Sequence, residues 1–327
     1  MKILSRALVG SVLIAAAWAL APAAAAADEF PSRPITIVVP YAAGGTSDMQ
    51  VRMISEPLSK ILGQPVIVDN RPGASGAIGA SAVARAQPDG YTLLFPNNGL
   101  VIAALTNQQA GYDPVKDFAS VSLVSNVPMV LVANKDLPAN NLSEFIAYAK
   151  QNPGKLNYAT AGVDSYGNLA THVLAQQAGI QMTGIPYKGE ANTTMAVRTG
   201  EAQVLLTSPS GTMLGLVKDG SLRMLGVATE KHSELVPNAQ PIAEVVPGFR
   251  SEIWFGLLAP AHTPPETIKK LNAAVVQVLA DRSIRDRFFG TGAIVQGSTP
   301  ETFAAMIRDD LRRFGDVVRK SNIKSDQ

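Results

Sequence analysis

Few residues in this 327-residue chain could carry out covalent chemistry. It contains three histidines, His172, His232 and His262, and no cysteine, so thiolate catalysis, disulfides and zinc–sulfur sites are excluded. The histidine spacing fits no helical metal site, and neither a Gly-x-Ser-x-Gly elbow nor a phosphate-binding loop occurs. A hydrolase built from His172, Asp164 and a serine is an alternative that only geometry can test. The residues therefore predict a protein without enzymatic activity, metal or cofactor.

Two loops have residue types suited to binding a small molecule. Residues 40–48 and 160–168 each follow a predicted strand, precede a predicted helix, and are rich in glycine and hydroxyl groups. At a helix N-terminus, unpaired N–H groups and the positive end of the dipole favour an anion, and glycine lets that anion approach the backbone. Either loop alone could be an ordinary capped turn. The pair predicts a carboxylate site.

Other candidates occupy equivalent positions after further predicted strands, where ligands of open α/β sheets bind. The full set of candidate ligand-binding residues is Tyr41, Ala43, Gly44, Gly45, Thr46, Ser47, Asp48, Asn97, Asn98, Ala161, Gly162, Asp164, Ser165, Tyr166, Gly167, Asn168, Lys188, Thr207 and Ser208.

The elements that must position these residues alternate as strand and helix. Short β-branched runs such as residues 35–39 are followed by amphipathic stretches, which is typical of βα units and a mainly parallel sheet. Long apolar segments at 121–133 and 253–259 flank a second βα series. We expect two lobes joined by two crossover strands, with a ligand cleft between them. The second series comprises residues 157–160, 185–187, 204–206 and 222–228, and helices are predicted to begin at Pro264–Pro265 and Thr299–Pro300.

Capping residues mark both ends of the helix predicted after the loop at 40–48. Gly63 stands where a C-terminal cap is expected, and Ser47 with Gln50 fits a capping box at the N-terminus. Pro57 lies inside the apolar pattern, so we expect it to kink or shorten this helix.

Residues 1–27 have the composition of a cleaved secretory signal. Lys2 and Arg6 flank the start of an apolar run, and small residues precede Asp28. A membrane anchor is the alternative, but it needs about 20 apolar residues. Because Lys2 and Arg6 are two of the 28 basic residues, cleavage leaves 26 basic and 26 acidic side chains, and a neutral exported protein is a poor nucleic-acid binder. We expect a monomer that is neither anchored nor lipidated.

Motifs spread along the chain indicate a family. They run, in order, through Pro31–Ile35, Gly44–Asp48, Val68–Gly76, Pro88–Leu94, Pro153–Tyr158, Pro186–Gly189, Trp254–Pro260 and Thr263–Pro265. Together they resemble the Bug (TctC-like) family, the periplasmic solute-binding receptors of tripartite tricarboxylate transporters.

The resemblance implies an α/β fold of two lobes, a periplasmic-binding-protein or Venus-flytrap architecture. It implies that residues 43–48 and 161–168 grip one ligand carboxylate, and that the partners are transporter membrane subunits or, alternatively, a sensor kinase. Members of the family take di- and tricarboxylates, acidic amino acids or aromatic carboxylates. The corresponding division is a signal at 1–27, lobe I at 28–126 and 252–327, and lobe II at 127–251.

Four residues bear on the choice of ligand. Asp164 places a negative charge beside the predicted grip, and Gln203 stands where the family often has an aspartate. Tyr41 and Tyr166 could flank a flat ligand, which would favour an aromatic carboxylate.

Overall fold

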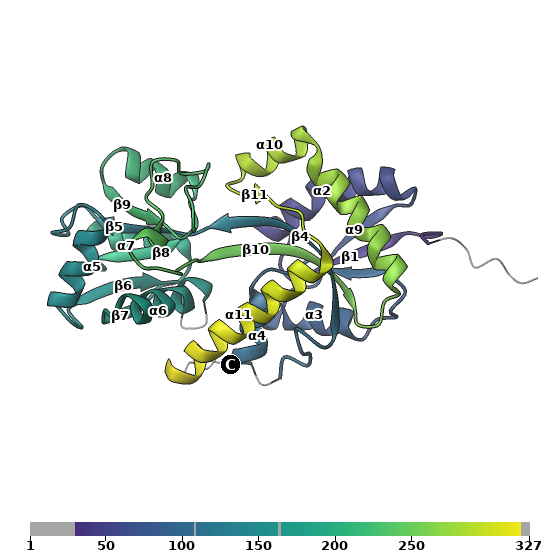
Figure 1. Ribbon diagram of the computed structural model, residues 1–327, viewed down its shortest axis with the longest axis horizontal. Coiled ribbons are helices and arrows are strands. Elements are labelled where there is room, and N and C mark those ends of the chain that lie inside the picture. Colours follow the sequence, from purple (N-terminus) through teal and green to yellow (C-terminus); the bar gives the residue numbers. More distant parts are fainter. Residues whose placement is uncertain (1–29, 108, 163–164, 322–327) are drawn as a thin grey trace, which may run out of the picture. The chain divides into compact units, whose positions relative to one another are not determined.

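Two separate β-sheets organise the chain, as the computed structural model shows for residues 30–107, 109–162 and 165–321 (Figure 1). Residues 33–327 form one compact unit and residues 1–32 another, of which only 30–32 are described. The predicted signal at 1–27 thus lies outside the described residues. Within the described ranges, no helix is both long enough and apolar enough to cross a bilayer.

The first sheet has six strands in the order β11-β4-β10-β3-β1-β2. Strands β1 to β4 share one direction, because β1 pairs in parallel with β2 and β3, while β10 is antiparallel to both β3 and β4. The strand bounds are β1 Ile35–Val39, β2 Val66–Asn70, β3 Thr92–Leu94, β4 Phe118–Pro128, β10 Glu252–Pro260 and β11 Ile294–Val295.

The second sheet has five strands in the order β7-β6-β8-β5-β9. Strand β6 is parallel to β7 and β8, and β5 runs against both of its neighbours, β8 and β9. The sheet is therefore mainly parallel, as expected. Its strands are β5 Val130–Asn134, β6 Leu156–Thr160, β7 Met182–Pro186, β8 Val204–Thr207 and β9 Leu222–Val227.

The chain passes between the sheets twice, which confirms the predicted two-lobed fold with a double crossover. Strand β4 ends one residue before β5 begins, and the second passage lies between β9 and β10. The two passages are hydrogen-bonded to each other: Met129 N–H donates to the Ser251 carbonyl at 3.0 Å, and Ala228 N–H donates to the Met129 carbonyl at 2.8 Å. The boundaries predicted at 126/127 and 251/252 stay a prediction.

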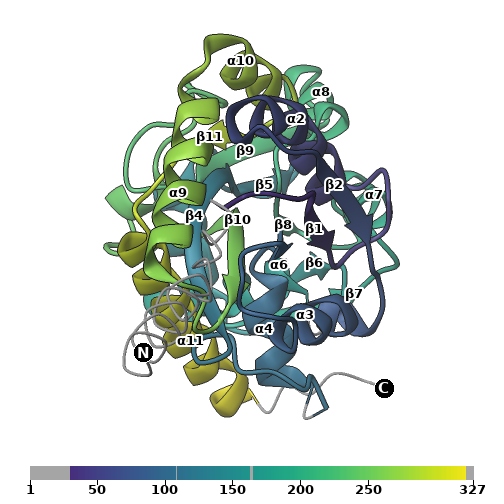
Figure 2. The ribbon, with the colours of Figure 1, turned by 90° about the vertical axis from the view of Figure 1, so that its right-hand side faces the viewer.

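Helices cover both faces of each sheet because the strands bury apolar side chains on both sides. Figure 2 shows α2 and α9 on one face of the first sheet and α3 and α4 on the other. Helix α11 shares the second face, where Trp254 and Phe303 meet at 5.2 Å between ring centroids. The helices are α2 Thr46–Leu62, α3 Ala77–Ala84, α4 Gly99–Thr106, α5 Leu142–Gln151, α6 Tyr166–Ala178, α7 Glu190–Thr199, α8 Gly211–Lys218, α9 Pro265–Ala280, α10 Arg282–Gly290 and α11 Pro300–Ser321, with short 3-10 turns η2 Ala74–Gly76 and η3 Ile242–Glu244.

The predicted ends of α2 are confirmed at one end only. Gly63 is the C-cap with φ +71°, as expected. The capping box is wrong, because Gly45 is the N-cap without a side-chain bond and the Gln50 side chain instead accepts a hydrogen bond from Ser125 at 2.6 Å. The helix also continues through Pro57 rather than ending there. Its fully buried neighbour Ile54 and the rest of the apolar face hold it against the sheet, which offsets the bond that proline cannot donate.

The predicted start of the last helix is confirmed. Thr299 precedes Pro300, and its hydroxyl accepts a hydrogen bond from Thr302 N–H at 3.2 Å. Helix α9 likewise begins at Pro265.

Candidate functional site

The loop after β1 ends in a helix N-terminus that no side chain caps. Residues 42–46 are exposed, Gly44 has a φ of +82°, and Gly45 makes no side-chain cap bond to α2. The first N–H groups of a helix have no partner inside it, so the start of α2 carries backbone donors suited to an anion. The exposed Thr46 hydroxyl adds a further donor at the same place. This loop retains the features predicted for a carboxylate grip.

Asp48 supports this loop from beneath. Its side chain is buried, as is that of Ser47, at 4% and 3% exposed. One carboxylate oxygen accepts a hydrogen bond from Gly44 N–H and the other from Arg52 Nε, each at 2.9 Å. Burial by itself raises the pKa of this carboxyl, but the hydrogen bonds from Arg52 and Gly44 outweigh it, so the pKa is lowered. Asp48 is therefore ionised and fixes the shape of the loop.

The ionised state of Asp48 makes stability depend on acid pH. A carboxyl whose pKa is lower in the folded protein contributes stability above its unfolded pKa of about 3.9, and this contribution is lost as pH falls. We expect the wild-type protein to lose more unfolding free energy between pH 6 and pH 3 than Asp48→Asn does, as measured by urea denaturation. Parallel pH profiles for the two proteins would contradict this role.

The second loop, after β6, is capped from within. Ser165 is the N-cap of α6; its hydroxyl accepts from Asn168 N–H at 3.3 Å and donates to the Gly162 carbonyl at 2.8 Å. The Thr160 hydroxyl lies 2.9 Å from the Ser165 hydroxyl. Ala161 is exposed beside them. This loop is thus held in shape by hydroxyl groups that a ligand would have to engage or displace.

A cavity of about 250 Å³ joins the flanks of the two loops. Tyr41, which precedes the first loop, and Tyr166, at the first position of α6, both line it. The Tyr41 hydroxyl donates to Asn97 Oδ1 at 2.6 Å, and the Tyr166 hydroxyl donates to the Glu252 carbonyl at 2.8 Å. Burial raises the pKa of both phenols, so both are neutral. The cavity therefore brings together candidates that lie after β1, β3 and β6.

Sequence reasoning missed six of the ten described residues that line the cavity. Ser75 follows β2 and could have been found by the same rule that selected the other post-strand residues. The apolar members carry no such indication, since in sequence they are typical of core positions. The missed residues are Ser75, Gly99, Ile102, Ala103, Thr106 and Ile253.

The other candidates of the second lobe lie in varied surroundings. Asn168 is buried, and its Oδ1 accepts a hydrogen bond from the Tyr158 hydroxyl at 2.7 Å. Gly167 packs α6 closely on β8, because an added Cβ would lie 3.0 Å from the Leu206 carbonyl oxygen. Thr207 is buried, Ser208 is half-buried and Lys188 is exposed. Asp164 lies outside the described residues.

Gln203 has a structural role away from the cavity. Its Oε1 accepts from Asn157 N–H at 2.8 Å and its Nε2 donates to the Gly200 carbonyl at 3.1 Å. These bonds lie where β6 and β8 begin, whereas the candidate loop follows the end of β6. Gln203 therefore tells little about the ligand.

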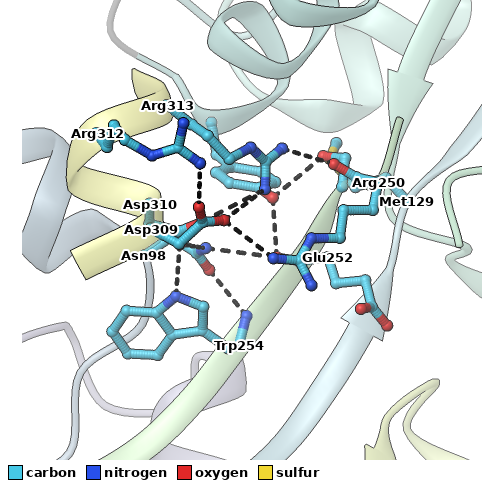
Figure 3. A network of polar contacts seen from close by, with 11 residues as sticks. Asn98, Met129, Arg250, Glu252, Trp254, Asp309, Asp310, Arg312 and Arg313 are labelled. Carbon is cyan, nitrogen blue, oxygen red and sulfur yellow. Dashed lines mark hydrogen bonds and ion pairs between the residues drawn. The ribbon is translucent and has the colours of Figure 1, made fainter. Parts of the chain in front are cut away.

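A buried polar network lies beside the cavity, where the two passages between the lobes meet (Figure 3). Asp310 Oδ2 accepts hydrogen bonds from Asn98 Nδ2 at 2.9 Å and from Trp254 Nε1 at 2.7 Å, and Arg313 lies 3.8 Å from its other oxygen. Burial raises the pKa of the Asp310 carboxyl, opposed by Trp254 and Arg313. Asn98 thus uses its side chain in the network, although it also lines the cavity.

The network continues from Asp310 into the second lobe. Arg313 donates to the Arg250 carbonyl at 2.8 Å. The Ser251 hydroxyl donates to the Tyr166 hydroxyl at 3.1 Å and lies 3.3 Å from Met129 Sδ. Helix α11, the crossover strands and the first turn of α6 are therefore connected by hydrogen bonds.

The described geometry does not support the hydrolase alternative. His172 Nε2 lies 3.3 Å from the Tyr158 hydroxyl, and burial lowers the pKa of this histidine. The hydroxyl of Ser165 is bonded to Gly162 and near Thr160, and not to a histidine. In the described ranges, His, Asp and Glu side chains form no group of three or more that could hold a metal ion.

Two mixed sheets, each with most of its strands in one direction, are joined by two hydrogen-bonded passages, and a cavity is lined from both lobes. This architecture is that of the periplasmic-binding-protein class. The chain belongs to the TctC family, because the model of the tripartite tricarboxylate transporter family receptor matches residues 50–323.

Relatives of the chain include proteins solved with bound carboxylates. Protein BugT of Bordetella pertussis (strain Tohama I) is 32% identical over 316 residues, which cover 96% of each chain. The structure of Rpa4515 from R. palustris with adipate is 33% identical, has a TM-score of 0.72, and covers 90% of this chain and 99% of its own. MatC from Rhodopseudomonas palustris with bound malate is 32% identical, with a TM-score of 0.68 and coverage of 88% and 100%.

Proposed function

We propose that this protein is an exported solute receptor that captures a small carboxylate and delivers it to the membrane subunits of a tripartite tricarboxylate transporter. The observation that carries the proposal is the uncapped N-terminus of α2, where Gly44, Gly45 and Thr46 are exposed a few residues after Tyr41, which lines the cavity shared by both lobes. Membership of the receptor family and the adipate and malate bound to similar proteins support the same ligand chemistry. The signal-like segment at 1–27 supports export.

The binding step needs no reaction chemistry from the protein. A carboxylate at the start of α2 would accept backbone and Thr46 hydrogen bonds, which are stronger than neutral ones because the acceptor is charged. A ligand that also touches Tyr166 binds better when both lobes are close, and it shifts the lobes towards that arrangement by this difference in affinity. The closed surface is then what a membrane partner would recognise.

Thermal unfolding of residues 28–327 with a ligand panel tests the function. The panel contains citrate, succinate, aspartate, glutamate, nicotinate, benzoate and terephthalate, with glucose as a control. A ligand at 1,000 times its Kd adds about 4 kcal/mol, which raises the Tm by several degrees. We expect at least one carboxylate and no sugar to do so. The proposal would be overturned if no carboxylate raised the Tm, or if glucose alone raised it.

Substitutions in the two loops then test the site. Thr46→Ala is expected to weaken binding of the identified carboxylate by about ten- to a hundredfold without lowering stability, because one charge-assisted hydrogen bond is lost. Ser165→Ala is expected to weaken binding and also to lower the unfolding free energy by about 1 kcal/mol, since α6 loses its cap.

Asn141→Ala is the matched control for the second variant. Asn141 caps α5, where it accepts from Glu144 N–H at 2.9 Å, and α5 contributes no residue to the cavity. It should show the same loss of stability with unchanged affinity. Wild-type affinity in Thr46→Ala would show that the loop after β1 does not grip the ligand.

A further inference from the structure

The cavity beside Tyr41 and Tyr166 has walls without formal charge. Ten described residues line it, and none has a side chain that is charged at neutral pH. The set combines apolar side chains, such as Ile102 and Ile253, with hydroxyl and amide groups. Its volume of about 250 Å³ lies just below the range of roughly 300 to 1,000 Å³ that ligand sites usually have. The cavity therefore suits the body of a small organic molecule.

The helix that begins at this cavity cannot offer its backbone to an anion. Helix α4 starts at Gly99, whose N–H already donates to Asn97 Oδ1 at 2.8 Å. The N–H groups of residues 100–102 donate to the carbonyls of Asn97 and Asn98 at 2.9 to 3.1 Å. In α2, by contrast, the N–H groups of residues 46–48 make no hydrogen bond among the described residues. The start of α2 thus has free donors for a carboxylate, whereas the donors at the start of α4 are already bonded.

The polar groups left in the cavity are neutral. Asn97 Oδ1 accepts from both the Tyr41 hydroxyl and Gly99 N–H, and among the described residues its Nδ2 makes no hydrogen bond. The Ser75 hydroxyl is exposed at the wall, and the Thr106 hydroxyl donates to the Ile102 carbonyl at 2.9 Å. An amide and a hydroxyl of this kind match a carbonyl, ether or hydroxyl oxygen on a ligand.

We propose that this receptor selects monocarboxylates with an uncharged body over dicarboxylates built on the same skeleton. The inference rests on the proposed function, because it assumes that one carboxylate of the ligand binds at the start of α2. A second carboxylate placed in the cavity would lose its water and gain only neutral side-chain donors such as Asn97 Nδ2, with no cation and no free backbone donors, and burying a charge without a counter-charge is costly. An apolar or hydroxylated body meets no such penalty.

Isothermal titration with two matched pairs tests the selection: benzoate against terephthalate, and hexanoate against adipate. The monocarboxylate is expected to bind at least tenfold more tightly in each pair that gives measurable heat. Equal or tighter binding of the dicarboxylate in either pair overturns the inference and leaves the proposed function intact. The inference is also overturned, with the proposed function intact, if only molecules with two or more carboxylates raise the Tm in the ligand panel. If no carboxylate binds at all, the proposed function and the inference both fail.

A positive charge introduced at the cavity wall tests whether the body of the ligand occupies this cavity. Thr106→Lys places a cation on the last residue of α4, so the preference for the monocarboxylate is expected to fall by at least tenfold. Thr199→Lys is the matched control, because Thr199 also ends a helix and also donates to the carbonyl four residues earlier, at 3.1 Å, outside the cavity. It should bind like wild type. An unchanged preference in Thr106→Lys would show that the ligand body does not occupy this cavity.

Discussion

Replacing Asp310 with alanine is expected to lower the free energy of unfolding by about 3 to 5 kcal/mol, the usual cost of removing one member of a buried charged network. Asp310 is 5% exposed and accepts hydrogen bonds from Asn98 Nδ2 and Trp254 Nε1. Without the carboxylate, Trp254 Nε1 stays buried with no acceptor and Asn98 Nδ2 keeps only the Glu252 carbonyl at 3.4 Å, and an unsatisfied buried donor costs about 1 to 3 kcal/mol. Arg313 also loses one of its partners, 3.8 Å away. Urea denaturation followed by tryptophan fluorescence measures the change.

Asp316→Ala on the same helix is the control for this substitution. Asp316 is half exposed and, among the described residues, forms an ion pair only with Arg319, three residues later on the helix surface, so its removal should change stability by less than about 0.5 kcal/mol. Equal effects of the two substitutions would show that the network contributes no more than a surface ion pair.

Gly79→Ala is expected to lower the unfolding free energy by about 3 kcal/mol, at the upper end of the cost of overpacking. A Cβ on Gly79 would lie 2.8 Å from the Arg71 carbonyl oxygen and 2.9 Å from Pro40 Cα. Both neighbours are backbone, so α3 itself must move away from the strand ends. Because Pro40 begins the loop that carries the proposed carboxylate grip, ligand affinity should fall with stability. Urea denaturation and the titration with benzoate check the two effects.

Gly215→Ala provides a control of opposite sign. Gly215 lies within α8, is exposed, and has no atom within 4 Å of the position its Cβ would take. Alanine is the better helix former, so this variant should gain about 0.5 to 1 kcal/mol. A destabilised Gly215→Ala, or a Gly79→Ala protein as stable as wild type, would contradict the packing argument.

Most strands could be predicted because they combine β-branched or apolar residues with turn residues at their ends, although β7 begins three residues before the expected run at 185–187 and β11 was not expected. Residues 35–39 form β1 as expected, and the apolar run at 253–259 lies within β10. The run at 121–133 was expected as one segment, whereas it contains β4 and β5, which belong to different sheets. Composition cannot locate the break at Met129, because apolar residues on either side suit a buried strand in either sheet.

The two candidate loops could be selected from the sequence, whereas the cavity wall could not. Glycines and hydroxyls after β1 and β6 indicate loops before helices, and their role in binding a carboxylate stays a prediction. Whether a side chain faces the ligand depends on tertiary contacts, and Asp48 and Asn168 both face inward because Gly44 and Tyr158 bond to them there. Ile102 and Ala103 were not selected because a cavity wall and a core have the same apolar composition.

The position of β10 governs the order in which the first sheet can be completed during synthesis. In the sheet β10 lies between β3 and β4, yet it comes more than 120 residues after β4 along the chain. A nascent chain that stops before residue 252 contains all five strands of the second sheet but lacks the strand that joins β3 to β4. Pairing over such a long separation is slow, because the loop must close before the contacts form. The second lobe can therefore fold while the first still lacks its central strand, and the cavity, which is lined by Tyr166 of the second lobe and by Ile253 of β10, is completed last.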